Sequence, residues 1–305
     1  MSAGIGGGLA ESPRGRFLAL APAMLVIGIF MLIPLMIMLA ISLMEPNVYG
    51  GVHRQFSPDA YVQFLFQRDF DDNLVFNPGY LYILGRSLGL AGSATLICFL
   101  LGFPVAWYIV RRPAHQRNLL IFLVTIPFWT NLLIRAYAWI IILGRGGVID
   151  TPLHWLGLMG PDASISVLYT NWAILIGLVY TYLPLMILPI YASLERLDFR
   201  LFEAAADLYS SKWASMRHVV VPLALPGIFA GVILVFVPAL GDFISAQLLG
   251  GSRRLMLGNL VQLQFSTARN WPFGAAVAVI LLIFVLASML AYLRLNRKTG
   301  LELSK

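Results

Sequence analysis

The stretch from Glu195 to Gly227 reads ERLDFRLFEAAADLYSSKWASMRHVVVPLALPG and is a charged island between two long apolar segments. In its first half, apolar residues recur at three- and four-residue steps, which predicts an amphipathic helix. A second short helix is predicted from about Ser211 to His218. Pro222 and Pro226 are then predicted to stop and restart the chain where the next apolar run begins. The stretch is therefore expected to form two short helices at the edge of a membrane.

The rest of the 305-residue chain is dominated by apolar side chains, with 59% hydrophobic and 11% charged residues. Soluble domains carry about 25% charged residues, so this composition indicates a membrane protein. Five uncharged runs reach the roughly 20 residues that cross a bilayer core of about 30 Å: Phe17–Met44, Ser87–Val110, Ala163–Leu194, His218–Gly241 and Asn270–Leu293. A sixth run, Asn118–Ile134, is shorter but continues into apolar AYAWIIILG, so we predict an all-α polytopic membrane protein with six transmembrane helices.

Most of the lysines and arginines fall on one side of these six predicted spans, together with both termini and the charged stretch. The positive-inside rule therefore predicts that the termini and residues 195–227 are cytoplasmic. The predicted organisation is a cytoplasmic tail over residues 1–16, a membrane domain over 17–295 and a second cytoplasmic tail over 296–305. The net charge of +7 has the same explanation, so nucleic-acid binding is not predicted.

No arrangement of residues in the sequence predicts an enzyme or a metal site. The four histidines lie in separate segments without an HxxxH spacing, and the single cysteine, Cys98, falls inside a predicted span. There is no GxxxxGK[ST] phosphate loop, so the chain is not expected to hydrolyse ATP by itself. Asp242 and Arg135 are the ionisable residues expected at membrane depth, and together they form no catalytic set.

The string EAAADL (203–208), followed by a basic, aromatic-containing helix and VVVPLALPGI, resembles the EAA loop of ABC-importer permeases that depend on a binding protein. In that family the loop lies in a groove of a cytoplasmic ATPase and transmits its motions to the membrane helices. The resemblance assigns ATPase coupling to these residues: Glu203, Ala204, Ala205, Asp207, Leu208, Tyr209 and Lys212. The family usually has Gly at position 209, where Gly permits a left-handed turn that is unfavourable for Tyr.

A second resemblance covers residues 127–150, PFWTNLLIRAYAWIIILGRGGVID, which are similar to a recurring string of the spermidine/putrescine branch of these permeases, PFWTxxLIRxYAWxxILGRxGxIN. Asp150 stands where the branch usually has Asn. Further matches are PALGDFISAQLLGG (238–251), GNL (258–260) and NWPFGAA (270–276). The resemblance extends over nearly everything from the second predicted span onward and implies the six-helix fold of type I ABC-importer permeases.

The resemblance also implies a location, a cargo and a set of partners. The chain would lie in a bacterial inner membrane as a multi-pass permease for polyamines, with no cofactor of its own and with ATP-Mg on the ATPase. The implied partners are a cytoplasmic ABC ATPase dimer, a second permease subunit, an extracytoplasmic polyamine-binding protein and membrane lipid. Two alternatives remain open: a permease of the same family for another small solute, and an ion-driven secondary transporter.

Asp242 is the residue that most directly suggests a cation pathway. It lies 16 positions after Pro226, about 24 Å along a helix, which places it in the outer half or at the outer edge of the fifth span. Acidic residues at such depth mark cation pathways, and Pro238 and Gly241 favour a local helix break just before it. The alternative is an interfacial Asp that pairs with Arg135, Arg253 or Arg254.

Aromatic and polar residues near the predicted third and fourth spans complete the candidate pathway, because aromatic rings attract ammonium groups. The candidates are Trp129, Asn131, Tyr137, Trp139 and Tyr182. For each aromatic residue, simple packing or a place at the membrane interface is the alternative. If the third span is one straight helix from Asn118, Arg135 lies about 26 Å along it, near the outer boundary.

The segment from Glu45 to about Tyr80 is predicted to face outward and to carry several acidic residues. Ser57 and Pro58 signal the start of a short helix over Asp59–Gln67. This segment is either a contact surface for an external binding protein or a solvated loop. The sequence does not decide between these two interpretations.

Overall fold

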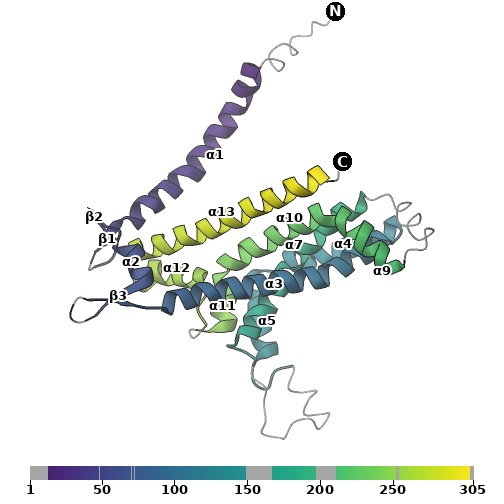
Figure 1. Cartoon of the computed structure of the whole chain (residues 1–305). Helices are drawn as coiled ribbons and strands as arrows, with labels where there is room; N and C mark the ends of the chain where they lie inside the picture. The colour runs from purple at the N-terminus through teal and green to yellow at the C-terminus, as the bar shows by residue number, and fades with distance from the viewer. Residues whose placement is uncertain are drawn as a thin grey trace, which may run out of the picture.

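The computed structural model describes residues 13–47, 49–69, 71, 73–148, 167–196, 211–251 and 254–302. Three long helices, α3 (Gly79–Val110), α7 (Asn171–Glu195) and α10 (Val221–Gly241), pack against one another and form its centre. α13 (Trp271–Glu302) runs beside them, and α1 (Pro13–Ser42) meets α13 and then diverges from it toward the N-terminus (Figure 1). Apart from Ser42 at its end, the spanning part of α1, Leu20–Ser42, has no buried residue.

The three central helices approach closely because small residues face large ones. Gly102 of α3 and Gly231 of α10 both contact Met186 of α7, and Gly227 lies against the Pro189 carbonyl. A Cβ atom at Gly227 or Gly231 would collide with these neighbours, so the glycines set the spacing of the helices, as small residues do in membrane bundles. Cys98 is fully buried in the same core, where its thiol donates to the Val179 carbonyl at 3.7 Å.

Within the described ranges, five helices are long and apolar enough to span a membrane, and a bent pair can supply a sixth span. This pair is α4 (Ala114–Trp129) and α5 (Leu132–Leu143), whose axes meet at 90°. The six-helix class predicted from the uncharged runs is confirmed. The straight third span assumed for Arg135 is wrong, because α4 ends at Trp129 and α5 begins in a new direction at Leu132, three residues before Arg135.

The predicted coupling residues Glu203, Ala204, Ala205, Asp207, Leu208 and Tyr209 lie outside the described residues. Lys212 opens α9 (Lys212–Ser215), which continues through a π-helical turn, η1 (Met216–Val220), directly into α10. The stop and restart predicted at Pro222 and Pro226 is therefore wrong. Pro222 stands at the start of α10, where a missing backbone N–H is tolerated, and the wide π turn just before it takes up the changed hydrogen-bond pattern.

The segment between α1 and α3 combines a short helix with two β-hairpins at one end of the bundle (Figure 1). Strand β1 (Met44–Pro46) pairs with β2 (Val52–Phe56), and β3 (Phe66–Arg68) pairs with β4 (Leu74–Phe76), both antiparallel. The predicted helix is present as α2 (Asp59–Leu65) and ends two residues early, where β3 begins. The hairpins are an addition to the helical class that was predicted.

Candidate translocation site

The first candidate element is a break between α10 and α11 (Phe243–Gly250) at Asp242. Asp242 has extended backbone angles, and its carboxylate accepts hydrogen bonds from the Ser245 amide at 2.9 Å and the Ser245 hydroxyl at 2.7 Å. It is thus the N-cap of α11, a position at which Asp is strongly preferred. The helix break expected from Pro238 and Gly241 is present.

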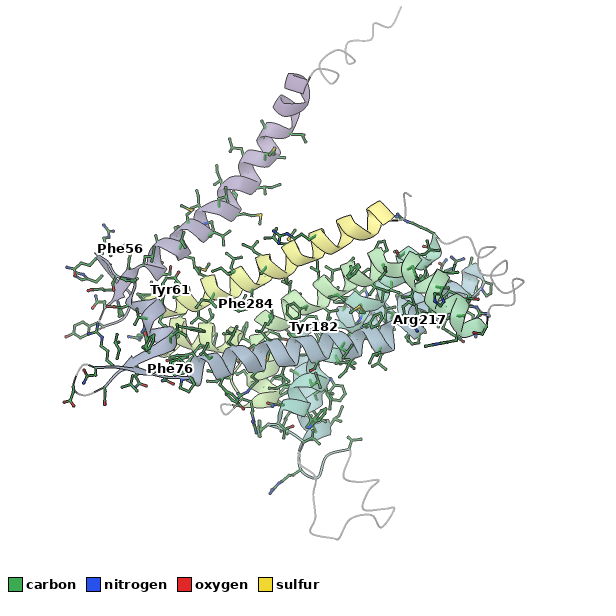
Figure 2. All side chains as sticks on the ribbon, viewed as in Figure 1. Phe56, Tyr61, Phe76, Tyr182, Arg217 and Phe284 are labelled. Atoms are coloured by element: carbon green, nitrogen blue, oxygen red, sulfur yellow. The ribbon has the colours of Figure 1, made fainter. Side chains whose placement is uncertain are left out.

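A tyrosine from α7 closes the other side of this carboxylate. The Tyr182 hydroxyl donates to Asp242 Oδ2 at 3.2 Å and lies 3.4 Å from the Pro238 carbonyl. Tyr182 is near the middle of α7, and Figure 2 shows it between Phe76 at one end of the bundle and Arg217 at the other. The carboxylate therefore sits inside the bundle, and Asp242 is only 8% exposed.

The Asp242 carboxylate receives neutral donors in the part of the chain that the structure describes. Its partners there are one amide and two hydroxyls, and neither Arg135 nor Arg254 forms an ion pair with it. Arg253, the third partner considered, lies outside the described residues. A buried carboxylate that receives neutral donors is suited to attract a cation.

Residues of α12 (Leu257–Ser266) contact the backbone on both sides of this break. The Asn259 side chain donates to the Phe243 carbonyl at 2.8 Å, and Ser87 of α3 accepts from the Leu257 amide at 2.8 Å. Gly258 lies against the Gly241 carbonyl, so closely that a Cβ atom would stand 2.6 Å from that oxygen. The GNL string, singled out in the sequence without a role, thus clamps the backbone on both sides of Asp242.

Sequence reasoning missed Ser245, Gly258 and Asn259 as parts of this site. A signal for the contact with Ser245 was present, because Asp is a preferred N-cap residue whose side chain accepts from the amide two or three positions later. No signal in the sequence showed that residues 258 and 259 return to the backbone of residues 241–243, since that contact depends on how α12 folds back.

The second candidate element is the break between α4 and α5. Asn131 caps α5, since its side-chain oxygen accepts from the Leu133 amide at 2.8 Å. Arg135 folds back across the break and donates to the Pro127 carbonyl at 3.2 Å. Its guanidinium also lies 5.9 Å from the centre of the Tyr180 ring, which makes an edge contact with Trp139 at 5.5 Å.

The predicted pathway residues thus fall into four groups. Asp242 and Tyr182 are in direct contact, while Trp139 reaches Arg135 through Tyr180. Asn131 has a structural role as a helix cap. Trp129 and Tyr137 lie on the surface of the chain, where they are 81% and 57% exposed. Because α5 packs against α7 and α11, both breaks belong to one region of the bundle.

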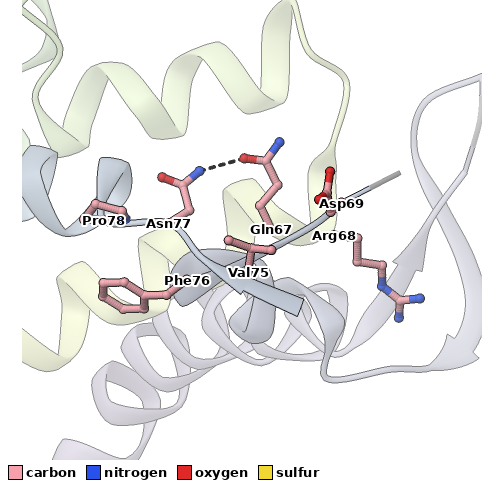
Figure 3. A pocket seen from close by; sticks show the side chains of 7 residues that line it. All are labelled: Gln67, Arg68, Asp69, Val75, Phe76, Asn77 and Pro78. Atoms are coloured by element: carbon pink, nitrogen blue, oxygen red, sulfur yellow. Dashed lines mark hydrogen bonds between the residues drawn. The ribbon is translucent and has the colours of Figure 1, made fainter. Parts of the chain in front are cut away.

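A separate hollow lies among the hairpins at the far end of the molecule. It has a volume of about 360 Å³ and is lined by residues of β3, β4 and the turn into α3: Gln67, Arg68, Asp69, Val75, Phe76, Asn77 and Pro78. One hydrogen bond crosses it, from Asn77 Nδ2 to Gln67 Oε1 at 2.9 Å (Figure 3). It shares no residue with the two breaks. In the described ranges, no group of three His, Cys, Asp or Glu residues is placed to bind a metal ion.

A bundle of spanning helices whose interrupted helices meet inside it defines a membrane permease. A family profile described as the inner membrane component of binding-protein-dependent transport systems matches residues 3–300, and the chain belongs to this family. The resemblance to these permeases inferred from the EAA loop is therefore confirmed. The chain is a multi-pass permease component of the inner membrane and has no catalytic role of its own.

Individual relatives agree with this family. The chain is 39% identical over 278 residues to the spermidine/putrescine transport system permease protein PotB of Escherichia coli, which covers 90% of this chain and 96% of that protein. It is 44% identical over 232 residues to the protein of the same name from Haemophilus influenzae, covering 75% and 80%. An inner membrane ABC transporter permease of E. coli, YdcU, is 36% identical over 230 residues, covering 72% and 73%.

Solved structures of permeases share the fold. A chain of a bacterial alginate ABC transporter superimposes with a TM-score of 0.69, covering 95% of this chain and 96% of that one at 15% identity. A chain of the MetNI methionine ABC transporter gives a TM-score of 0.54, covering 73% and 99% at 19% identity. These likenesses confirm the predicted importer-permease fold.

Proposed function

We propose that this chain forms half of the translocation pathway of an ATP-driven importer for polyamines such as putrescine and spermidine. The observation that carries the proposal is the Asp242 carboxylate, which is buried in the bundle beside Tyr182 and receives neutral donors in the described structure. The similarity to two permeases named for spermidine and putrescine supports the cargo. Another organic cation would suit the same site.

The chemistry of the site explains how it would handle such a cargo. A polyamine carries several ammonium groups, and a desolvated carboxylate attracts one of them more strongly than a solvated one would. The Tyr182 hydroxyl, at 3.2 Å from Oδ2, can yield its place to an ammonium donor while its ring stays nearby. The Tyr180 and Trp139 rings offer further faces for cation–π contact. An ammonium group would then bind in turn to the carboxylate and to these rings, with an affinity at each that is low enough for release.

The rest of the transporter is part of the same proposal. A second permease subunit would supply the other half of the pathway, and an extracytoplasmic binding protein would deliver the polyamine. A cytoplasmic ATPase dimer would bind ATP-Mg and dock on residues 195–227, with both termini on the same side. Reversing the charge of Glu203 (Glu203→Lys) tests this docking, because the ATPase should no longer co-purify with the permease.

Uptake by the complete complex in proteoliposomes tests the cargo and the site together. Asp242→Asn keeps the size of the side chain but removes its charge. A hydrogen bond to a charged group contributes about 1.5–3 kcal/mol, which the variant should lose. We expect uptake of labelled putrescine or spermidine to fall roughly ten- to a hundredfold, with normal assembly. Asp242→Glu, which keeps the charge at the same position, is the matched control and should retain more uptake than Asp242→Asn. Wild-type uptake in Asp242→Asn would remove Asp242 from the pathway.

A further inference from the structure

A polar cluster joins α4 to α7 at the end of the bundle that leads into residues 197–210. Glu195 is the last residue of α7, and Arg117 stands in the first turn of α4. Arg117 Nη1 lies 2.9 Å from Glu195 Oε1, and the Tyr191 hydroxyl donates to the same oxygen at 2.6 Å. A single carboxylate oxygen therefore links α4 to α7 through Arg117 and Glu195, which are 78 positions apart in the sequence.

This cluster fastens a helix that has little other hold on the bundle. α4 has no fully buried residue, and only Leu120, Ile121 and Val124 pack with partly buried side chains against the central core. Tyr191, by contrast, is buried in that core. The start of α4 is thus tied by charge and hydrogen bonding to a firmly packed part of α7, while its remaining length rests on the surface of the core.

The far end of α4 reaches the candidate pathway. Arg117 and Trp129 are twelve residues apart, which is about 18 Å of helix. Beyond Trp129 the chain turns by 90° into α5, and α5 packs against α11, whose first turn is capped by Asp242. A continuous series of packed elements therefore runs from Glu195, the first residue of the predicted coupling stretch, to the Asp242 carboxylate.

We propose that Arg117, Tyr191 and Glu195 form a coupling latch, which makes α4 follow the root of the coupling loop and so moves the α4–α5 break when the ATPase moves that loop. The three residues are positioning residues, since none of them lies in the candidate pathway. The inference rests on the proposed function for its direction, from ATPase to pathway. The physical link between α4 and α7, by contrast, rests only on the described contacts.

The latch is suited to transmission rather than to stability. The Arg117 and Glu195 side chains are 25% and 46% exposed, and ion pairs with that much solvent contact contribute little to folding. Variants of the pair should therefore fold and assemble. A purely structural pair would leave transport unchanged when removed, whereas a latch would lose the link between ATP hydrolysis and uptake.

Charge reversal in the complete complex tests the latch. Arg117→Glu and Glu195→Arg should each lower polyamine uptake per ATP hydrolysed by at least tenfold, while the double variant Arg117→Glu/Glu195→Arg restores the pair and should recover half or more of the wild-type ratio. Arg112→Glu makes the same charge reversal in the exposed turn just before α4 and should change nothing. Wild-type ratios in both single variants, or no recovery in the double variant, would overturn the proposal.

A distance measurement separates this inference from the identity of the cargo. Spin labels at exposed Leu123 of α4 and exposed Ala192 of α7 report the movement of α4 against α7 without any substrate. ATP binding should leave this distance unchanged in the wild-type complex, because the two helices move together, and should change it in Glu195→Arg. An ATP-driven change in the wild-type complex, or none in Glu195→Arg, would overturn the latch. If the distance behaves as expected but the complex takes up no polyamine, the assigned cargo is wrong and the latch stands.

Discussion

The two helix breaks that meet in this permease are built in opposite ways. The α10–α11 break at Asp242 is buried and is held by α7, α11 and α12 through side-chain hydrogen bonds from Tyr182, Ser245 and Asn259. The α4–α5 break is held by its own segment, through the Asn131 cap and the contact of Arg135 with the Pro127 carbonyl. It stands beside the exposed ring of Trp129.

This difference shows which break can move. Contacts from several elements fix the backbone around Asp242, so the carboxylate keeps its place while the surrounding helices shift. Contacts within one segment fix the local angle at Thr130 and Asn131, and α4 has no buried residue, so α4 can shift more easily than the backbone around Asp242. The break at Asp242 therefore keeps a fixed geometry, whereas the α4–α5 break can shift together with α4. Variants that remove or disturb contacts at either break test this comparison.

The largest effect is expected from Gly258→Ala. The new Cβ atom would meet the Gly241 carbonyl oxygen, so the backbone clamp behind Asp242 has to open. Overpacking of this kind costs about 1–3 kcal/mol. Thermal unfolding of the purified protein in detergent should show a lower Tm. Gly92→Ala is the control, because no atom lies within 4 Å of a Cβ there. If Gly258→Ala and Gly92→Ala have the same Tm, the contact between Gly258 and the Gly241 carbonyl does not hold the backbone firmly.

Tyr182→Phe should have the next largest effect, on transport rather than on folding. The variant keeps the ring and removes the hydroxyl that donates to Asp242 and lies near the Pro238 carbonyl. A hydrogen bond to a charged group contributes about 1.5–3 kcal/mol, so apparent affinity for polyamine should change by roughly tenfold or more. Initial uptake rates over a range of polyamine concentrations measure it. Unchanged kinetics would mean that Tyr182 only packs against the break.

Asn131→Ala probes the movable break and should cost less. It removes the cap of α5 and leaves the Leu133 amide without its side-chain acceptor. Loss of such a cap costs about 0.5–2 kcal/mol, and the exposed setting favours the lower end because water can replace the bond. The Tm should fall by less than in Gly258→Ala. A larger fall would show that the α4–α5 break is as firmly fixed as the one at Asp242.

Trp129→Ala should have the smallest effect on the isolated chain. The side chain is 81% exposed, and substitutions at such positions usually change stability by less than about 0.5 kcal/mol. The same variant should matter more in the assembled transporter if a second subunit covers this ring. Unfolding of the chain alone and of the complex, measured side by side, gives the comparison. A large loss in the isolated chain would contradict the exposed position.

The sequence was sufficient to predict the spans and the break at Asp242. Long uncharged runs have no other stable place than a bilayer, and Pro238 with Gly241 weakens the helix just before the acid. The 90° turn at Thr130 was not predicted, because no Gly lies there and the apolar run continues through it. Its cause is the combination of Pro127 and the Asn131 cap, which reads as a turn only once α5 is seen to pack on α11.

The remaining differences have a common physical reason, since they depend on partners distant in sequence. Pro222 seemed to end a helix, but the π turn before it lets the helix continue. Asn259 and Gly258 matter through residues 241–243, and Arg117 matters through Glu195. Local propensity carries no information about such pairs. The roles of the predicted coupling residues at 203–209 stay predictions.

The π-helical turn η1 (Met216–Val220) determines how the residues before it are rotated around the axis of α10. A π turn holds one more residue than an α-helical turn, and each residue of an α-helix advances by about 100° and 1.5 Å. Removing one residue from this turn would therefore convert it to an α-helical turn and leave Lys212 and Trp213 at nearly the same angle around the axis, whereas removing one residue from α10 would rotate them by about 100°. The wide turn thus lets the chain that enters the fifth span carry an additional residue while the same flank still faces the membrane bundle.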